Sequence, residues 1–265
     1  MMIYLLKNKN IYVSIIINKN VNDINIRRNI MKKLITTFAF IALSTVSAKA
    51  VDLEIFSVTG GLAANQSVFG ATAVQNNRDE ANALRSTKSK SGVFTDSHRS
   101  QFIELGIGRF ISIGYEHTPD SITTPTNTTR KDMTDEANVS VDFNDLNTTY
   151  IKINLPGGVY AKAGTVETDL DIKETMANSR TYKNVSTEGT MMGLGYQYFV
   201  KDTGFGLRFE GSYLELDNVS TSNGISATGA TVANGGRNQI DASNLEGLTG
   251  KIALTYTFGR AGNSY

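Results

Sequence analysis

Seven charged residues lie at alternate positions inside runs whose other residues are largely apolar or small. Within these runs the charged side chains share a face with many glycine, serine and threonine residues, while large apolar side chains occupy the other face. The seven residues are Glu104, Glu116, Lys152, Lys162, Arg208, Glu210 and Lys251. Because an unpaired charge away from water is costly, we expect them to form ion pairs in a common interior.

A second group that could do chemistry consists of His98, Ser100 and Glu104. Residues an even number of positions apart on a strand point to the same face, and a base beside a serine and an acid is the arrangement of nucleophilic hydrolysis. Only 2 histidines occur in 265 residues, so such a combination easily arises by chance. Its activity depends on which face of the fold the three residues occupy.

Runs with a period of two predict the β-strands that position these residues. In the last run, 245–258, large apolar residues lie on one face: Phe258, Tyr256, Leu254, Ile252 and Leu248. The opposite face carries Thr257, Thr255, Ala253, Lys251 and Thr249. The other predicted strands are 51–64, 98–109, 111–118, 146–155, 158–170, 188–200 and 204–216. Short turns alternate with four long polar loops, at 65–97, 119–145, 171–187 and 217–244.

An even number of strands, alternating short and long connections, and strands of about ten residues are typical of transmembrane barrels. A soluble β-sandwich also has alternating runs, but it does not explain the regular alternation of connection lengths. We therefore predict an all-β fold, an eight-stranded antiparallel up-and-down transmembrane β-barrel, over residues 51–265. An interior of this size is just filled by side chains, so the charged residues are expected to plug it.

Aromatic residues near the ends of the predicted strands indicate an interfacial girdle at the periplasmic rim. The girdle is expected to contain Phe110, Tyr160, Tyr198, Phe199, Phe205, Tyr256 and Phe258.

The N-terminal region carries an export signal. Met31-Lys32-Lys33 is followed by the apolar stretch 34–46 and by a small-x-small cleavage box at Ala48 and Ala50, which predicts a secretory signal peptide over 31–50. Residues 1–30 are interpreted as an over-called upstream extension, with a long signal or a membrane-anchored N-terminus as the alternative. Residues 1–50 hold eight basic residues and one acidic residue, which leaves 18 bases and 24 acids in the barrel region. This acidic balance argues against nucleic-acid binding.

Two features resemble known outer-membrane proteins. The final strand, with Leu254, Tyr256 and Phe258, is similar to the C-terminal signal strand that the outer-membrane assembly machinery reads, although seven residues follow the phenylalanine. The hairpins at 106–117 and 193–216 resemble those of OmpA-type or "porin family" small barrels, which include opacity-like proteins. No peptidoglycan-binding domain follows Phe258, so a cell-wall tether is not expected.

The resemblance implies a barrel in the Gram-negative outer membrane but no particular activity. Barrel-shaped lipid A deacylases use a His-x-Ser pair and a glutamate on the lipid face, whereas Glu104 is predicted to face the interior. We therefore expect no enzyme activity, no catalytic residue and no metal or cofactor. The absence of cysteine also excludes thiolate metal ligands.

The favoured function is a structural or surface-interaction role in the envelope. The expected partners are outer-membrane lipid and lipopolysaccharide, the barrel assembly machinery and an unidentified ligand of the external loops, but not nucleic acid. A narrow ion or small-solute channel is the alternative, and a lipid A-modifying enzyme is less favoured.

Overall fold

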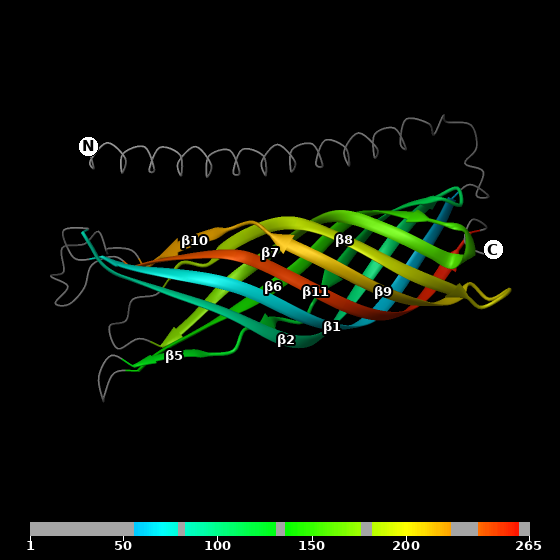
Figure 1. Ribbon diagram of the computed structural model, residues 1–265. Coiled ribbons are helices and arrows are strands. Elements are labelled where there is room, and N and C mark those ends of the chain that lie inside the picture. The colour runs from blue at the N-terminus through cyan, green and yellow to red at the C-terminus, as the bar shows by residue number, and fades with distance from the viewer. Residues whose placement is uncertain (1–55, 79–82, 131–135, 176–181, 224–237, 260–265) are drawn as a thin grey trace, which may run out of the picture. The chain divides into compact units, whose positions relative to one another are not determined.

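The computed structural model describes residues 56–78, 83–130, 136–175, 182–223 and 238–259 (Figure 1). The predicted signal peptide, its cleavage residues Ala48 and Ala50, and the extension 1–30 lie outside the described residues. Among the described residues, no helix has the length and apolar character needed to cross a membrane.

Eight of the strands form a closed antiparallel ring, which confirms the predicted fold class. In order around the ring they are β1 (Phe56–Arg78), β2 (Leu84–Ile107), β3 (Ile111–Thr118), β6 (Glu136–Asn154), β7 (Val159–Thr175), β8 (Val185–Phe199), β9 (Phe205–Leu216) and β11 (Asn238–Phe258). The β1–β11 pair, with Val58 opposite Phe258, closes the ring. Short strands β4 (Ile122–Thr123) and β5 (Asn127–Arg130) pair with β6, and β10 (Val219–Ser222) pairs with β11. Closure matters because a free strand edge in lipid would leave backbone groups unpaired.

One end of the barrel is built from tight turns. The β2–β3 turn contains Gly108 at φ 62°, and the β8–β9 turn contains Asp202 at φ 62° and Gly204 at φ 76°. A single 3₁₀ turn, η1 (Pro156–Gly158), joins β6 to β7. Glycine or a short polar residue suits these left-handed positions. Short turns mark the periplasmic end of such barrels, and we call the opposite end the external end.

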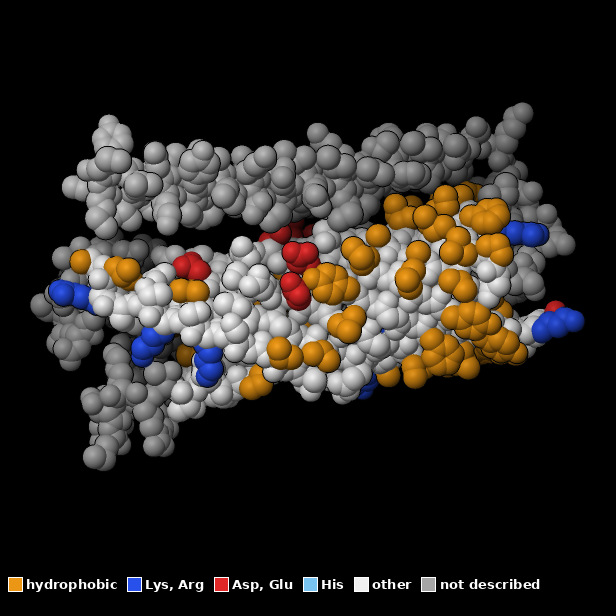
Figure 2. Space-filling view, viewed as in Figure 1, with side chains coloured by type: hydrophobic (Ala, Val, Ile, Leu, Met, Phe, Trp, Pro, Cys, Tyr) orange, Lys and Arg blue, Asp and Glu red, His pale blue; other side chains and the backbone are white. Residues whose placement is uncertain are grey.

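The outer face around the periplasmic half of the barrel is apolar. Figure 2 shows hydrophobic side chains gathered over the end with the tight turns, and few over the other half. The exposed side chains include Leu62, Ile103, Ile153, Met192, Leu194, Phe209, Ile252 and Leu254. The final strand has the predicted parity, with Leu254 and Phe258 exposed and Lys251, Thr255 and Thr257 buried. An apolar exterior around a closed ring is the arrangement that a bilayer stabilises.

The prediction of an aromatic girdle is correct in part. Phe110, Tyr198, Phe205 and Phe258 are exposed on the outer face, and the rings of Phe205, Tyr256 and Phe258 pack edge to face in sequence. The assignment of Tyr160 to the girdle is wrong, because its side chain is 1% exposed inside the barrel. Its position has the parity of Lys162, and that parity places it inside.

The prediction of long polar loops is wrong over much of their length. Strand β1 continues to Arg78, β2 begins at Leu84, and β6, β7 and β11 extend similarly beyond the apolar belt. Hydroxyl and amide side chains bond across these extensions, as where Thr87 Oγ1 donates to Asn76 Oδ1 over 2.9 Å. About ten residues suffice to cross a bilayer, so the rest of each strand lies in water. There a strand needs no apolar outer face, and the alternation that marks it in sequence is lost.

The interior of the external half is apolar rather than empty. A cluster of buried side chains, here called the apolar cluster, consists of Phe69, Ile122, Phe143, Tyr150, Val166, Leu170, Met191, Leu214, Leu216 and Leu245. The rings of Phe69, Phe94 and Phe143 pack together at centroid separations of 5.3 to 6.5 Å. These three phenylalanines come from stretches that the sequence analysis treats as loops. The apolar cluster therefore caps the charged interior on its external side.

Candidate functional site

The seven charged residues singled out in the sequence, here called the charge network, all point into the barrel. They come from six of the eight ring strands: β2 supplies Glu104, β3 supplies Glu116, β6 and β7 supply Lys152 and Lys162, and β9 and β11 supply the other three. None of the seven is more than 7% exposed, and Arg208 and Glu104 are each 1% exposed. Alternation along each strand places these side chains inside, and the strand register brings them to a common level.

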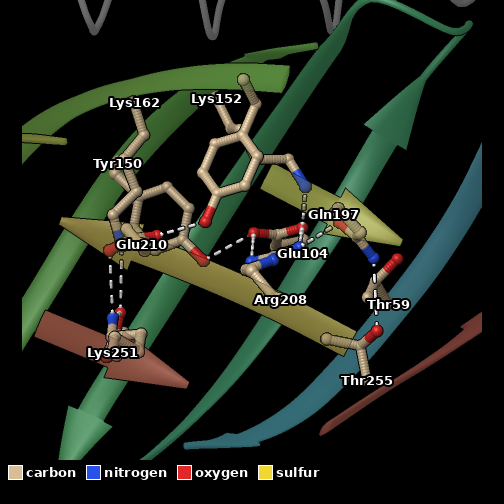
Figure 3. Close-up of polar contacts among 12 residues, drawn as sticks. Thr59, Glu104, Tyr150, Lys152, Lys162, Gln197, Arg208, Glu210, Lys251 and Thr255 are labelled. Atoms are coloured by element: carbon tan, nitrogen blue, oxygen red, sulfur yellow. Dashed lines mark hydrogen bonds and ion pairs between the residues drawn. The ribbon is translucent and has the colours of Figure 1, made fainter. Parts of the chain in front are cut away.

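Glu104 is the centre of one half of the charge network (Figure 3). Arg208 donates to both of its carboxylate oxygens, with Nη1–Oε1 2.7 Å and Nη2–Oε2 2.9 Å. Lys152 Nζ donates to Oε2 over 2.5 Å, and the Tyr150 hydroxyl donates to Oε1 over 2.8 Å. Two-pronged pairing of this kind fixes geometry as well as charge, because the planar guanidinium matches the carboxylate.

Glu116 and Glu210 form the other half together with two lysines. Lys251 Nζ donates to both oxygens of Glu116, at 2.5 and 2.6 Å, and Lys162 Nζ lies 3.2 Å from Glu116 Oε2. The same two lysines also form ion pairs with Glu210 Oε1, at 2.7 Å from Lys162 and 3.3 Å from Lys251. Each lysine is therefore shared between two carboxylates, and the four groups behave as one cluster.

Two tyrosines that the sequence analysis did not assign to the site join the halves. Tyr150 OH donates to Glu104 while the Lys162 ammonium lies 4.4 Å from the centroid of its ring, and Tyr160 OH donates to Glu210 Oε2 over 2.7 Å. Each ring covers a glycine directly across the strand pair, Gly114 under Tyr150 and Gly195 under Tyr160. A Cβ atom added at either glycine would lie 2.2–2.3 Å from the ring, so no larger residue fits without displacing it.

Polar side chains continue the network toward the periplasmic end. Arg208 Nη2 donates to Gln197 Oε1 over 2.8 Å, and Gln197 Nε2 donates to Thr255 Oγ1 over 3.2 Å. Thr59 and Thr257 bond through their hydroxyls over 2.9 Å. Polar groups thus fill the lumen below the ion pairs. Parity with Lys251 on the same strand is the sequence signal that could have found Thr255 and Thr257.

The structure places His98 and Ser100 inside the barrel with Glu104. His98 is 7% exposed and Ser100 is 3% exposed. Ser100 Oγ donates to Glu116 Oε1 over 2.7 Å and accepts a hydrogen bond from Asn65. Ser100 therefore belongs to the hydrogen bonding of the charge network. Within the described residues, no group of three or more His, Cys, Asp or Glu side chains could hold a metal ion.

The charge network and the apolar cluster form two adjacent layers in the barrel interior, above the polar side chains around Gln197. Tyr150 belongs to both, since its ring packs in the apolar cluster and its hydroxyl bonds Glu104. A fixed ion-pair layer under a layer of packed aromatic and aliphatic side chains is suited to closing a lumen.

The closed ring, its apolar belt and its polar interior together decide the class of the protein. The chain is an outer-membrane β-barrel. No protein-family model matches the sequence, and no curated protein sequence matches it.

Solved structures of outer-membrane proteins resemble the fold at low sequence identity. OprG of Pseudomonas aeruginosa aligns with a TM-score of 0.47 and 12% identity, over 75% of this chain and 96% of that one. Ail, the attachment invasion locus protein of Yersinia pestis, gives 0.34 and 9% over 75% and 99%, and the protease OmpT of Escherichia coli gives 0.35 and 9% over 81% and 100%.

Proposed function

We propose that this protein is a closed, non-catalytic barrel with a structural or surface-interaction role at the outside of the Gram-negative envelope. The observation that carries this proposal is the filled interior: paired charges at one level and packed apolar side chains above them. A second observation supports the surface role: five of the ring strands continue beyond the apolar outer face and expose polar sheet at the external end.

The absence of an enzymatic role is part of this proposal. Hydrolysis of a lipid acyl chain requires a nucleophile and base that the chain can reach from the bilayer. His98 and Ser100 are inside, and Ser100 is engaged by Glu116. Replacing His98 with alanine should therefore leave the mass of lipid A in producing cells unchanged. A mass change with the wild-type protein that the His98→Ala variant abolishes would overturn this part of the proposal.

Planar-bilayer recording of the refolded protein tests whether the barrel is closed. The paired charges and apolar cluster predict a silent membrane, with insertion verified separately by heat-modifiable gel migration. The alternative, a narrow ion or small-solute channel, predicts discrete conductance steps whose size or ion preference changes in the Arg208→Gln variant. Steps of that kind would show that the charge network is a filter, and they would refute the closed-barrel proposal.

We also propose a kinship with the OmpA-type or opacity-like small barrels. Its support is the pair of hairpins at 106–117 and 193–216, which form β2–β3 and β8–β9. The lipid and lipopolysaccharide around the apolar belt are the proposed membrane partners, and Leu254, Tyr256 and Phe258 are the proposed signal for the assembly machinery. A Phe258→Ala variant should accumulate unassembled, as seen in the loss of heat-modifiable migration in membranes.

A further inference from the structure

Among the described residues, the outer half of β2 is paired with another strand along only one of its two edges. Strand β2 pairs with β1 along its whole length, but it pairs with β3 only from Gln101 to Ile107. After β3 the chain continues along the same edge of β6, where β4 and β5 pair with β6 and face the outer half of β2 across an opening without pairing with it. In the described part of the chain, the external segment of β2 therefore has no strand on its second edge (Figure 1).

Hydrogen bonds at the base of this segment show which backbone groups face the open side. The Arg99 N–H donates to Asp120 Oδ2 over 2.9 Å, away from β1, and the Ser97 N–H donates to Asp96 Oδ1 over 2.7 Å. Backbone direction alternates along a strand, and the β1–β2 register is uninterrupted from Ser86 to Ile107. The N–H and C=O groups facing the open side are therefore those of Thr87, Ser89, Ser91, Val93 and Thr95, here called the free edge.

Between Thr87 and Thr95 the free edge has no bulge, no proline and no paired strand, although Lys88 and Lys90 lie along it. Natural edges are blunted by features of this kind and by charged side chains, above all lysine. Acidic side chains cap Ser97 and Arg99, but among the described residues no backbone or side-chain group caps the N–H groups of Thr87 to Thr95. Nine residues extend over roughly 27 Å, which is long enough to pair with a complete strand.

The side chains beside the free edge specify the chemistry of a strand that could join it. Lys88 and Lys90 are exposed and share the face that includes Phe94, which packs on Phe69 at the mouth of the barrel. Lys90 Nζ reaches across the opening to Asn127 Oδ1 on β5. A strand entering here would therefore place one set of alternate side chains against two ammonium groups and an aromatic ring.

We propose that the free edge of β2 is a docking site for an extended, acidic segment of a protein partner, added as a further β-strand. Backbone hydrogen bonds to Thr87–Thr95 would supply the affinity, and carboxylates facing Lys88 and Lys90, with an apolar residue near Phe94, would supply the specificity. This inference rests on the surface-interaction role proposed above and names the class of partner.

The probe for a test is a synthetic nine-residue peptide with alternating threonines, glutamates facing Lys88 and Lys90, and a valine facing Phe94. Fluorescence anisotropy should show saturable binding to the folded full-length barrel. Hydrogen exchange should show new protection at the amides of Thr87, Ser89, Ser91, Val93 and Thr95. N-methylation of the peptide amides that face β2 should abolish binding, whereas N-methylation of the alternate amides should not.

Protein variants separate backbone pairing from charge. Ser91→Pro removes one free-edge donor, and proline is tolerated where the N–H faces outward, so peptide affinity should fall at least about tenfold in a folded barrel. The matched Ser91→Ala variant keeps the N–H and should bind like the wild type. The double variant Lys88→Glu, Lys90→Glu should lose the acidic peptide and bind its lysine counterpart.

Two results would overturn the docking site: absence of peptide binding, or binding without protection of the five amides. Self-association of the barrel through β2, detected by cross-linking while the peptide fails to bind, would assign the edge to a second copy and would also overturn it. The two proposals fail in different experiments. A negative peptide result would refute the docking site but not the closed barrel, which a silent bilayer recording supports. Conductance steps would refute the closed barrel but not the docking site.

Discussion

The Glu104→Gln substitution gives the sharpest test of the charge network. The introduced amide would keep the size of the side chain but remove the carboxylate that Arg208, Lys152 and Tyr150 share. The charge network already holds four basic and three acidic groups, so this change raises its formal excess of positive charge from one to two. Arg208 and Lys152 would then lie beside each other in a buried site without their common counter-charge.

The expected loss of stability follows from the cost of a buried unpaired charge. Removing one partner of a buried ion pair costs about 3–5 kcal/mol, and the two oxygens of Glu104 serve two cations, so we expect the upper half of that range. At about 1.4 kcal/mol per factor of ten, a loss of ~4 kcal/mol lowers the folding equilibrium constant about a thousandfold. The Arg208→Gln variant should cost less, because it removes the excess charge while leaving Lys152 on Glu104.

Urea unfolding of the barrel in lipid vesicles, followed by heat-modifiable migration and tyrosine fluorescence, measures this difference. The matched control is Glu215→Gln, the same substitution at an exposed position opposite another acid, Glu246, where loss of like-charge repulsion should leave stability unchanged or slightly higher. The double variant Glu104→Gln, Arg208→Gln should recover part of the loss, which a double-mutant cycle would measure. A Glu104→Gln barrel as stable as its Glu215→Gln control would refute the account of the interior as a closed ion-pair layer.

Three further outcomes are expected. Gly195→Val should displace the Tyr160 ring that packs on this glycine and should lower the unfolding midpoint in urea. Gly211→Val, at an exposed position with open space, should leave the midpoint unchanged. Phe143→Ala should cost about 3–5 kcal/mol of unfolding free energy by leaving a cavity in the apolar cluster, and an unchanged midpoint would contradict its packing. Hydrogen bonds from Arg99 lower the pKa of the Asp120 carboxyl, which lies outside the membrane. These hydrogen bonds need the ionised carboxylate, so their contribution to stability is complete above the ordinary pKa of an aspartate and is lost as the pH falls through the lowered pKa. The Arg99 amide resonance should therefore shift only in acid.

Much of the membrane-spanning half was predictable from the sequence. Lipid requires apolar side chains outside and leaves polar ones inside, so alternation at Ile103, Glu104 and Leu105 or at Ile252 and Lys251 assigns each residue to a face. The same rule would have placed Tyr160 inside with Lys162. Its assignment to the rim girdle followed residue type rather than parity.

The external half was not predictable in the same way. In water a strand is stable with serine, threonine and asparagine on both faces, so the stretches around Thr72 and Ser91 carry no apolar contrast. Their pairing depends on long β1 and β2 strands continuing a register begun in the membrane. Phe69 and Phe143 lie far apart in the chain, and only the closed ring brings their rings together.

The sequence by itself determined the strand class, the inside and outside of each membrane strand, and the set of charges that must share the interior. A period of two is a local property, and the solvent on each side selects the residue types. Only the tertiary structure decided which carboxylate meets which cation, that two tyrosines cover glycines on neighbouring strands, and that β2 keeps a free edge. Those features depend on strand register and ring closure, which are set by contacts between residues distant in the chain.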